Sequence, residues 1–300
     1  MNALLFWAAS LALAQEQARD WAFLAGERFL PVRNVVYRKL PDGDLKLDFY
    51  VRYNKEPGPA VFYIFGGGWQ TGSKDQAVLR YLPYLQMGYR VVALEYRLSD
   101  RAAAPAQVED CRCALLWLAQ NGPRYGVDPK KLVIAGGSAG AQLALITAML
   151  DSTFDTACSP GTTLAAPPPA LAVLNYYGPT DMQMVYNTRR PHYLKLFRGI
   201  DDPLALAKKI SPLSWVRPGV PPVLTIHGDA DEQVPIHHAT ELHRLLDEAK
   251  VANELVIVPG GVHGRQFWTD AELLRVQRRV EAFLQRHAPV GKTAPQRSSP

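Results

Sequence analysis

Short apolar runs alternate with longer, partly polar segments over most of the chain. The runs are rich in Val, Ile, Leu and Tyr, which is typical of buried strands. We expect strands at residues 60–65, 89–96, 132–134, 171–176, 223–226 and 254–258. We expect helices at residues 74–87, 106–120, 139–150, 238–250 and 271–287. This alternation predicts an α/β protein whose mostly parallel sheet carries helices on both faces.

The N-terminal part of the chain has a different pattern. Residues 33–38 and 44–53 flank the turn sequence Pro41-Asp42-Gly43, and apolar and polar residues alternate in the second run. Alternation with a period of two, next to a turn, is typical of a hairpin. We therefore expect an antiparallel strand pair at the start of the fold.

Residues 178–220 break the alternation. The segment mixes prolines and charges with large aromatic residues and shows no clean periodicity. A small lid over a functional site and a long surface connection both fit this pattern. Its aromatic and cationic side chains include Tyr186, Tyr193, Phe197, Trp215, Arg189, Arg190, Lys195 and Arg198.

The two ends of the chain differ from the rest. Residues 1–14 are uncharged and close on Ala12-Leu13-Ala14, a small-x-small pattern that predicts a signal peptide and a secreted or periplasmic protein. A buried N-terminal helix is the alternative, because the run has no Lys or Arg before its apolar part. The run is too short to span a bilayer, so we expect no stable membrane insertion. We expect a catalytic domain over residues 15–289 and a disordered tail over residues 290–300.

Composition excludes several classes of function. The chain of 300 residues is 48% apolar, which suffices for one large α/β domain or two small ones. Its net charge of +5 comes from 33 basic and 28 acidic residues that are interleaved, without a basic run. Nucleic-acid binding usually needs such a run, so we expect no nucleic-acid partner. Nothing in the sequence indicates the oligomeric state.

The cysteines predict a disulfide rather than a metal site. Cys111, Cys113 and Cys158 lack the spacing of metal ligands. Cys111 and Cys113 would face different directions on a helix, so they cannot readily bond to each other. In an exported protein we expect Cys158 to pair with either Cys111 or Cys113.

The segment 131–150 contains a candidate nucleophile. An apolar strand runs into Gly136-Gly137-Ser138-Ala139-Gly140, which fits the G-x-S-x-G pattern of a serine at a sharp strand-to-helix turn. A Cβ atom at Gly136 or Gly140 would clash in such a turn. A helix that begins at Ala139 would point its N-terminus at developing negative charge. A glycine-rich turn with an incidental serine is the alternative interpretation.

Two loops after the last two strands carry the partners that such a serine needs. Residues 227–235 read HGDADEQVP and residues 260–264 read GGVHG. His263 is the predicted base, and Asp231 is the predicted carboxylate with Asp229 in reserve. Parallel strands would gather both loops and Ser138 at one edge of the sheet. Of the seven histidines, only His263 lies in a glycine-flanked loop after a strand; we expect His237, His238 and His243 on the helix surface and His227 at a strand end.

The loop Phe65-Gly66-Gly67-Gly68-Trp69 supplies the last element of a hydrolase site. It follows the strand at residues 60–65, where such enzymes keep half of their oxyanion hole. We predict that the N–H groups of Gly67 and Gly68, with that of Ala139, bind the oxyanion. A merely flexible glycine loop is the alternative. The predicted substrate contacts are Trp69, Tyr177 and Trp215.

These motifs together resemble the esterase and lipase side of the α/β-hydrolase superfamily. The sequences GGSAG, HGDADEQVP, GGVHG and FGGGWQTGSK carry the resemblance, which extends over residues 34–287. It is strongest to feruloyl and acetyl-xylan esterases and hormone-sensitive-lipase-like carboxylesterases, and kynurenine formamidases share it. The family usually has a histidine where this chain has Phe65. The resemblance implies an α/β-hydrolase fold with an eight-stranded sheet, hydrolysis through an acyl-enzyme, and no cofactor or metal.

We therefore expect a serine carboxylesterase that acts on short or aromatic acyl esters, either small molecules or esters linked to polysaccharide. Long acyl chains need an apolar cover, whereas the aromatic and cationic residues of 178–220 would form a rim suited to planar or sugar-bearing esters. An arylformamidase-type amidase is the first alternative. A non-catalytic binding module on the same fold is the second, although such modules usually lack a triad member.

Overall fold

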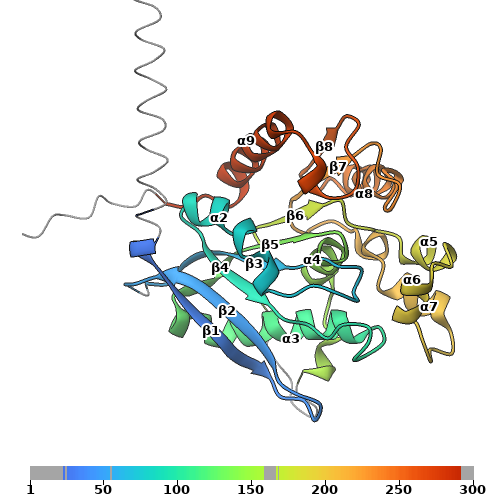
Figure 1. Ribbon diagram of the computed structural model, residues 1–300, viewed down its shortest axis with the longest axis horizontal. Coiled ribbons are helices and arrows are strands. Elements are labelled where there is room, and N and C mark those ends of the chain that lie inside the picture. The colour runs from blue at the N-terminus through green and yellow to red at the C-terminus, as the bar shows by residue number, and fades with distance from the viewer. Residues whose placement is uncertain (1–22, 24–25, 55, 159–166, 168, 292–300) are drawn as a thin grey trace, which may run out of the picture.

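The computed structural model describes residues 23, 26–54, 56–158, 167 and 169–291 (Figure 1). The predicted signal peptide, residues 1–14, lies outside the described residues, and so does most of the predicted C-terminal tail. In the described part of the chain, no helix is long and apolar enough to cross a membrane.

The core of the fold is an eight-stranded sheet with the strand order β1-β2-β4-β3-β5-β6-β7-β8. The strands are β1 (Phe29–Arg38), β2 (Leu45–Arg52), β3 (Gly58–Ile64), β4 (Arg90–Leu94), β5 (Val127–Gly137), β6 (Ala172–Tyr176), β7 (Val223–Gly228) and β8 (Asn253–Val258). β2 is antiparallel to both β1 and β4, and the other neighbouring pairs are parallel. The predicted N-terminal hairpin and mostly parallel sheet are confirmed.

Helices cover both faces of this sheet (Figure 1). The longer ones are α3 (Ala106–Asn121), α4 (Ala139–Met149), α8 (His237–Glu248) and α9 (Asp270–His287). α2 (Leu82–Gln86) and α9 lie on one face, whereas α3 and α4 pack against each other on the opposite face. α8 packs on the edge strand β8. The sheet is therefore buried between two helical layers, which explains why its central strands read as continuous apolar runs.

Residues 74–87, expected to form one helix, form two short ones. A 3-10 helix, η1 (Asp75–Arg80), precedes α2. Pro83 lies in the first turn of α2, where its missing N–H and fixed φ are tolerated, but it cannot continue a helix from the preceding turn. The chain therefore restarts as a helix after Arg80.

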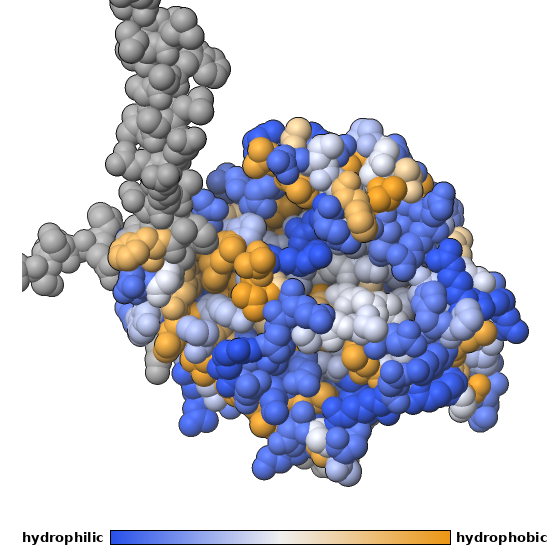
Figure 2. Space-filling model, in the orientation of Figure 1, coloured by the Kyte–Doolittle hydropathy of each residue, from blue (hydrophilic) through white to orange (hydrophobic). Residues whose placement is uncertain are grey.

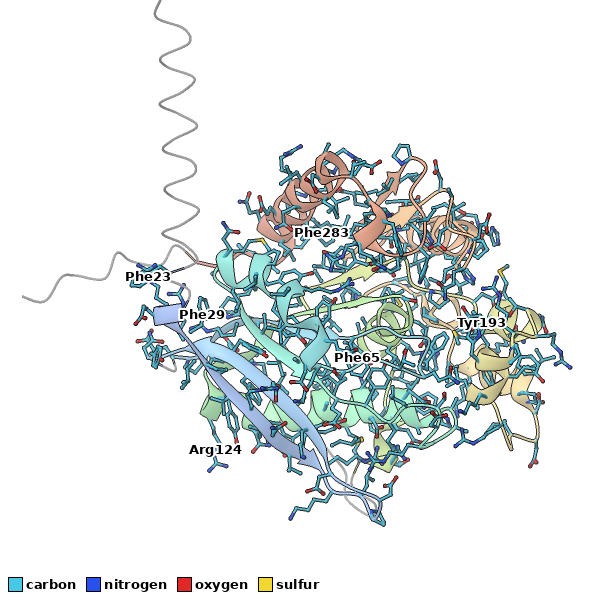
Figure 3. All side chains as sticks on the ribbon, in the orientation of Figure 1. Phe23, Phe29, Phe65, Arg124, Tyr193 and Phe283 are labelled. Atoms are coloured by element: carbon cyan, nitrogen blue, oxygen red, sulfur yellow. A yellow bond between two sulfur atoms is a disulfide. The ribbon has the colours of Figure 1, made fainter. Side chains whose placement is uncertain are left out.

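Aromatic side chains fill much of the core. Figure 3 labels Phe283 on α9, Phe65 at the end of β3 and Tyr193 in the segment 178–220. These three side chains are buried, whereas Phe23 at the N-terminal edge of the described chain is 70% exposed. The core thus extends from the helical layers to the loops at the carboxyl ends of the strands.

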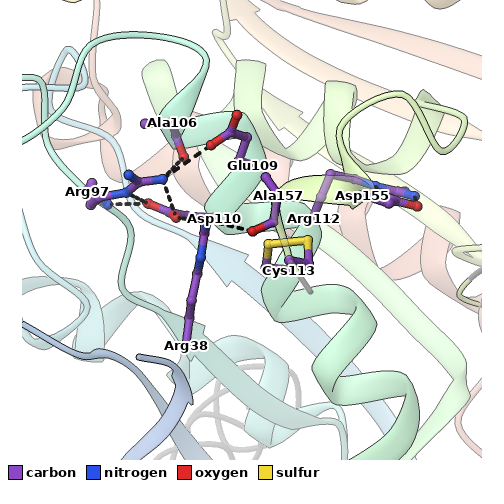
Figure 4. Close-up of a disulfide and its surroundings, with 10 residues drawn as sticks. Arg38, Arg97, Ala106, Glu109, Asp110, Arg112, Cys113, Asp155 and Ala157 are labelled. Carbon is purple, nitrogen blue, oxygen red and sulfur yellow. Dashed lines mark hydrogen bonds and ion pairs between the residues drawn. A yellow bond between two sulfur atoms is a disulfide. The ribbon is translucent and has the colours of Figure 1, made fainter. Parts of the chain in front are cut away.

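A disulfide joins α3 to the segment after α4. Cys113 bonds Cys158, which immediately follows the short 3-10 helix η3 (Asp155–Ala157) (Figure 4). Cys111 is a buried free thiol. Beside the disulfide, Arg112 donates to both carboxylate oxygens of Asp155 at 2.8 and 2.9 Å. The expected disulfide is confirmed, with Cys113 as the partner of Cys158.

A buried carboxylate fixes the loop after β4 to α3. Asp110 is fully buried and accepts hydrogen bonds from the Arg97 backbone N–H at 3.0 Å and from Arg97 Nε at 2.8 Å (Figure 4). Arg38 on β1 also pairs with it. Because an unpaired buried charge is costly, this cluster ties β1, the β4 loop and α3 together.

The disulfide predicts a defined thiol count. Protein from an oxidising compartment, alkylated in denaturant without reductant, should carry one label, on Cys111, and three labels after reduction. In a Cys113→Ser variant we expect two labels without reduction. The bond closes a loop of 45 residues, so its loss should destabilise the fold by about 4 kcal/mol in the chain-entropy picture. Intact-mass analysis checks the count, and three labels on unreduced wild type would contradict it.

Candidate active site

Ser138 lies at a sharp turn between β5 and α4. Its φ of 54° is in the left-handed region, which is strained for a residue with a side chain. Its N–H donates to Tyr176 O at 2.9 Å and so fixes the turn to β6. The turn needs glycine, because a Cβ atom on Gly136 would lie 2.3 Å from Gly140 O. A Cβ atom on Gly140 would lie 2.2 Å from Ile64 O, so the predicted clashes are confirmed.

The structure brings Ser138, His263 and Asp231 into one hydrogen-bonded chain. His263 Nε2 lies 2.9 Å from Ser138 Oγ, and His263 Nδ1 lies 2.7 Å from Asp231 Oδ2. The three residues follow β5, β8 and β7, which are parallel strands of one sheet. Their loops therefore meet at the carboxyl edge of the sheet, as expected.

Asp231 is held as a buried carboxylate. Its Oδ1 accepts hydrogen bonds from Gln233 N at 2.9 Å and Val234 N at 2.8 Å, and its Oδ2 lies 3.4 Å from His227 Nε2. Burial raises the pKa of Asp231, but the nearby His227 and the hydrogen bonds from His263 and the Val234 N–H outweigh it and hold the pKa well below the ordinary value. The carboxylate is therefore ionised at neutral pH and can stabilise a protonated His263.

Asp229 has a different position. It is exposed, and its Oδ1 accepts a hydrogen bond from Gly260 N at 2.6 Å. Gly260 begins the loop that carries His263. Asp229 therefore helps to fix this loop, while Asp231 contacts the histidine itself.

The glycine loop after β3 has an unusual backbone. Gly67, Gly68 and Trp69 all have positive φ, at 128°, 60° and 59°. A Cβ atom on Gly67 would lie 2.0 Å from Thr71 O, so this position requires glycine. Ala139 is the first residue of α4, and its N–H therefore has no acceptor within the helix.

Trp69 anchors this loop instead of lining the cavity. The side chain is 2% exposed, and its Nε1 donates to Gln142 Oε1 at 3.0 Å. Gln142 Nε2 in turn donates to Ile210 O at 2.8 Å. The neighbours Gly68 and Gln70 form the cavity wall. The structure thus corrects the prediction of Trp69 as a substrate contact, because its ring points into the protein.

Phe65, which stands where related proteins usually have histidine, is fixed by stacking. Its ring lies parallel to that of Tyr96, with 4.4 Å between ring centroids. Tyr96 Oη donates to Phe65 O at 3.0 Å. Stacking and this hydrogen bond therefore hold the start of the glycine loop without an imidazole.

Ser138 and His263 open into a cavity of about 430 Å³. Gly67 and Gly68 line it, and half of the other lining residues carry side-chain amides or hydroxyls. Apolar residues on this side of the molecule gather over α2, and the surrounding surface is mostly hydrophilic (Figure 2). Among the predicted substrate contacts, Tyr177 lines the cavity and places its ring edge on His263, with 4.9 Å between ring centroids.

Trp215 lies elsewhere. It ends the 3-10 helix η4 (Pro212–Trp215), and its Nε1 donates to Lys209 O at 2.8 Å. Trp215 is not one of the described residues that line the cavity. The prediction that Trp215 contacts substrate is therefore corrected, because its indole N–H closes the turn that follows α7 (Pro203–Lys209).

The segment 178–220 contains α5 (Met182–Asn187), α6 (Pro191–Leu196), α7 (Pro203–Lys209) and η4 beside the cavity. His192 of α6 lines the cavity. Tyr193 packs its ring edge on Trp69, and both Tyr193 and Phe197 are 4% exposed. The expected aromatic rim is therefore wrong, because these rings bind the segment to the core.

Three cations of this segment also contact the body of the protein. Lys195 forms an ion pair with Asp100, and Arg198 donates to Asp100 O at 3.1 Å. Arg190 donates to Glu232 O at 3.3 Å. These contacts attach the segment to the β4 loop and to the loop that carries Asp231.

Sequence reasoning missed one residue that supports the site and placed two others on the wrong face of their helix. Gln142 is the one polar residue between Ser138 and Ile146 in an apolar helix, which is a signal for a buried hydrogen bond. His238 and His243, expected on the helix surface, are 2% and 6% exposed. His238 Nδ1 accepts from the backbone N–H groups of Thr180 at 3.2 Å and Asp181 at 3.3 Å. α8 therefore buries His238 against the segment 178–220 and His243 against Asn253 of β8, while His237 lies on the surface as expected.

Comparison with known proteins identifies the class and then the family. The architecture is that of α/β-hydrolase esterases, because Thermogutta terrifontis esterase 2 phosphorylated by paraoxon has a TM-score of 0.73 at 26% identity, covering 88% of this chain and 96% of that one. The propionate-bound form of that esterase has a TM-score of 0.72 at 26% identity, covering 86% of this chain and 95% of that one. A truncated carbohydrate esterase from gut microbiota has a TM-score of 0.72 at 26% identity, covering 87% of this chain and 97% of that one.

The BD-FAE family model matches residues 47–246, so the chain belongs to the BD-FAE family. Esterase LipQ of Mycobacterium tuberculosis H37Rv is 32% identical over 216 residues, which are 69% of this chain and 50% of LipQ. The chain spans about half the length of LipQ and of the probable carboxylic ester hydrolase LipM of the same organism.

The two loop carboxylates should differ in their effect on catalysis. Asp231→Asn should lower kcat/KM for an ester by roughly ten-thousandfold, because the amide favours the wrong imidazole tautomer. Asp229→Asn should cost less than about tenfold, because its side-chain oxygen still accepts from Gly260 N–H. Steady-state kinetics on both variants measures the two losses. A larger loss of kcat/KM in Asp229→Asn would make Asp229, not Asp231, the carboxylate that orients His263.

His238 should make the fold sensitive to acid. Burial lowers its pKa to about 4, while the unfolded chain titrates near 6.5. Between these values the unfolded state binds the extra proton, so the free energy of unfolding should fall by up to about 3 kcal/mol as pH drops from 6.5 to 4. Denaturant titrations at each pH should show a weaker dependence in His238→Asn than in the control His237→Asn, whose side chain is exposed. Equal pH dependence in the two variants would contradict this role.

Proposed function

We propose that this protein is a serine carboxylesterase that hydrolyses short-chain or aromatic acyl esters. The observation that carries the proposal is the position of His263, within 2.9 Å of Ser138 Oγ and 2.7 Å of Asp231 Oδ2. A nucleophile, a base and an orienting carboxylate in this arrangement define the hydrolase triad. A binding module would not need a strained serine next to an aligned base.

The geometry supports a two-step acyl transfer. Ser138 Oγ attacks the ester carbonyl while His263 Nε2 takes its proton, and Asp231 stabilises the imidazolium. The backbone N–H groups of Gly67, Gly68 and Ala139 are the proposed donors to the oxyanion. His263 then returns the proton to the departing alcohol. Water, activated by the same histidine, releases the acid and restores the free serine.

The cavity supports small and polar ester substrates. Its volume of about 430 Å³ is in the range of small-molecule sites, and its wall carries many amides and hydroxyls. A long acyl chain would need a continuous apolar tunnel. Related structures include an esterase with bound propionate and a carbohydrate esterase, which support short acyl groups and, in our proposal, an ester linked to a sugar or polysaccharide.

Two further proposals concern the surroundings of the site. We propose that α6, which places His192 in the cavity wall, acts as a small cover over bound substrate. We also propose that the protein works outside the cytosol, in the secreted or periplasmic space. The Cys113–Cys158 bond supports this, because disulfides persist in oxidising compartments.

A hydrolysis panel tests the proposed activity. We expect kcat/KM for acetyl and feruloyl esters to exceed that for a dodecanoyl ester and for N-formylkynurenine by at least about tenfold, since the polar cavity favours compact esters. Ser138→Ala, as the control, should have no turnover above background and an unchanged melting temperature. Paraoxon should label wild type once and leave Ser138→Ala unlabelled. Preference for the formamide would replace the esterase proposal with the amidase alternative, and preference for dodecanoate would point to a lipase.

A further inference from the structure

Arg80 places a guanidinium at the wall of the cavity that contains Ser138. It is the last residue of η1 and lines the cavity together with Tyr63 and Gln76. The side chain is half-buried, so its charge is partly removed from bulk water. A guanidinium in such a position attracts anions more strongly than one on an open surface.

This positive charge is not neutralised by the cavity wall. None of the described residues that line the cavity is an aspartate or a glutamate. Asp75, the acidic residue at the other end of η1, forms ion pairs with Arg33 and Lys74. In the described part of the chain, Arg80 forms no ion pair, so its donors remain available to a ligand.

A second guanidinium reinforces the positive potential behind this wall. Arg265 follows the His263 loop, and its Cζ lies 4.3 Å from the centre of the Tyr176 ring. Burial raises the pKa of Tyr63, and the charges of Arg265 and Arg80 oppose that rise. Both cations thus act on the same ring of the cavity wall. Among the described residues, Arg265 also lacks an ion-pair partner, so a cation–π contact is its principal stabilisation.

We propose that this wall is a carboxylate-binding subsite, in which Arg80 pairs with a carboxylate that the ester carries in its acyl or alcohol portion. The inference rests on the proposed esterase function and names a class of substrate for it. Guanidinium binds carboxylate with two parallel hydrogen bonds, and Gln76 and Gln266 add amide donors to the same cavity. The net charge of +5 would also favour the approach of anionic esters.

Two matched ester pairs test the subsite. 4-Nitrophenyl hexanoate and mono-4-nitrophenyl adipate differ by a carboxylate in the acyl arm, and 4-acetoxybenzamide and 4-acetoxybenzoate differ in the alcohol arm. In at least one pair, Arg80→Gln should lower kcat/KM for the anionic ester by at least about tenfold more than for the neutral one, mainly through KM. Arg80→Lys should keep part of the difference, because a point charge replaces the bidentate fork.

The control is Arg278→Gln, which removes the same charge from an exposed position on α9 and should leave both members of each pair unchanged. Raising the salt concentration to about 1 M should weaken the preference for the anionic ester, since charge interactions are screened. Equal losses for the anionic and neutral esters in both pairs would overturn the subsite.

A binding measurement separates this proposal from the proposed activity. Calorimetric titration of Ser138→Ala with adipate and with 4-hydroxybenzoate requires no turnover. We expect saturable binding of at least one of these carboxylates, weakened by about tenfold or more in Ser138→Ala/Arg80→Gln. Absence of binding would overturn the subsite even if esters are hydrolysed. Binding without any ester turnover in wild type would instead support the subsite and reject the esterase function.

Discussion

The close approach of three backbone segments beneath Ser138 is the constraint on which the site depends. The start of α4, the end of β5 and the end of β3 come so near that Cβ atoms at Gly136 and Gly140 would overlap with carbonyl oxygens. This contact holds Ser138 in its strained conformation, and Ala139, the first residue of α4, keeps an N–H without an acceptor in the helix. Backbone packing therefore positions both the proposed nucleophile and one of the proposed oxyanion donors.

The acid and base are positioned by a second device, the buried carboxylate of Asp231. A lone buried carboxylate would be costly, but backbone N–H groups from its own loop and His263 satisfy its oxygens. These hydrogen bonds keep it ionised and fix the His263 ring. Asp229 fixes the neighbouring loop through Gly260. One loop after β7 thus orients the base and also holds the chain segment that supplies it.

Sequence reasoning predicted the mostly parallel sheet with its N-terminal hairpin, and it named the three residues Ser138, His263 and Asp231 that the structure brings together, because these depend on local patterns. Apolar runs, glycines with steric roles and loops at strand ends can be read one segment at a time. It failed for Trp69, Trp215, Tyr193 and Phe197, because composition indicates neither the direction of a ring nor the partner of its N–H. The same limit explains the error at His238. Its helix was predicted correctly, but the side of the helix that is buried was not.

The site therefore divides into two parts with different origins. Its catalytic part is built by backbone geometry at the ends of regular strands, where glycine patterns carry a strong signal. Its substrate-facing part comes from η1 and α6, short helices without periodicity, which contribute Arg80 and His192 to the cavity. Side chains on such segments can change without disturbing the strained serine or the buried carboxylate. In the subsite that we propose, the charge at Arg80 would therefore set this chain's substrate selectivity independently of the catalytic chemistry.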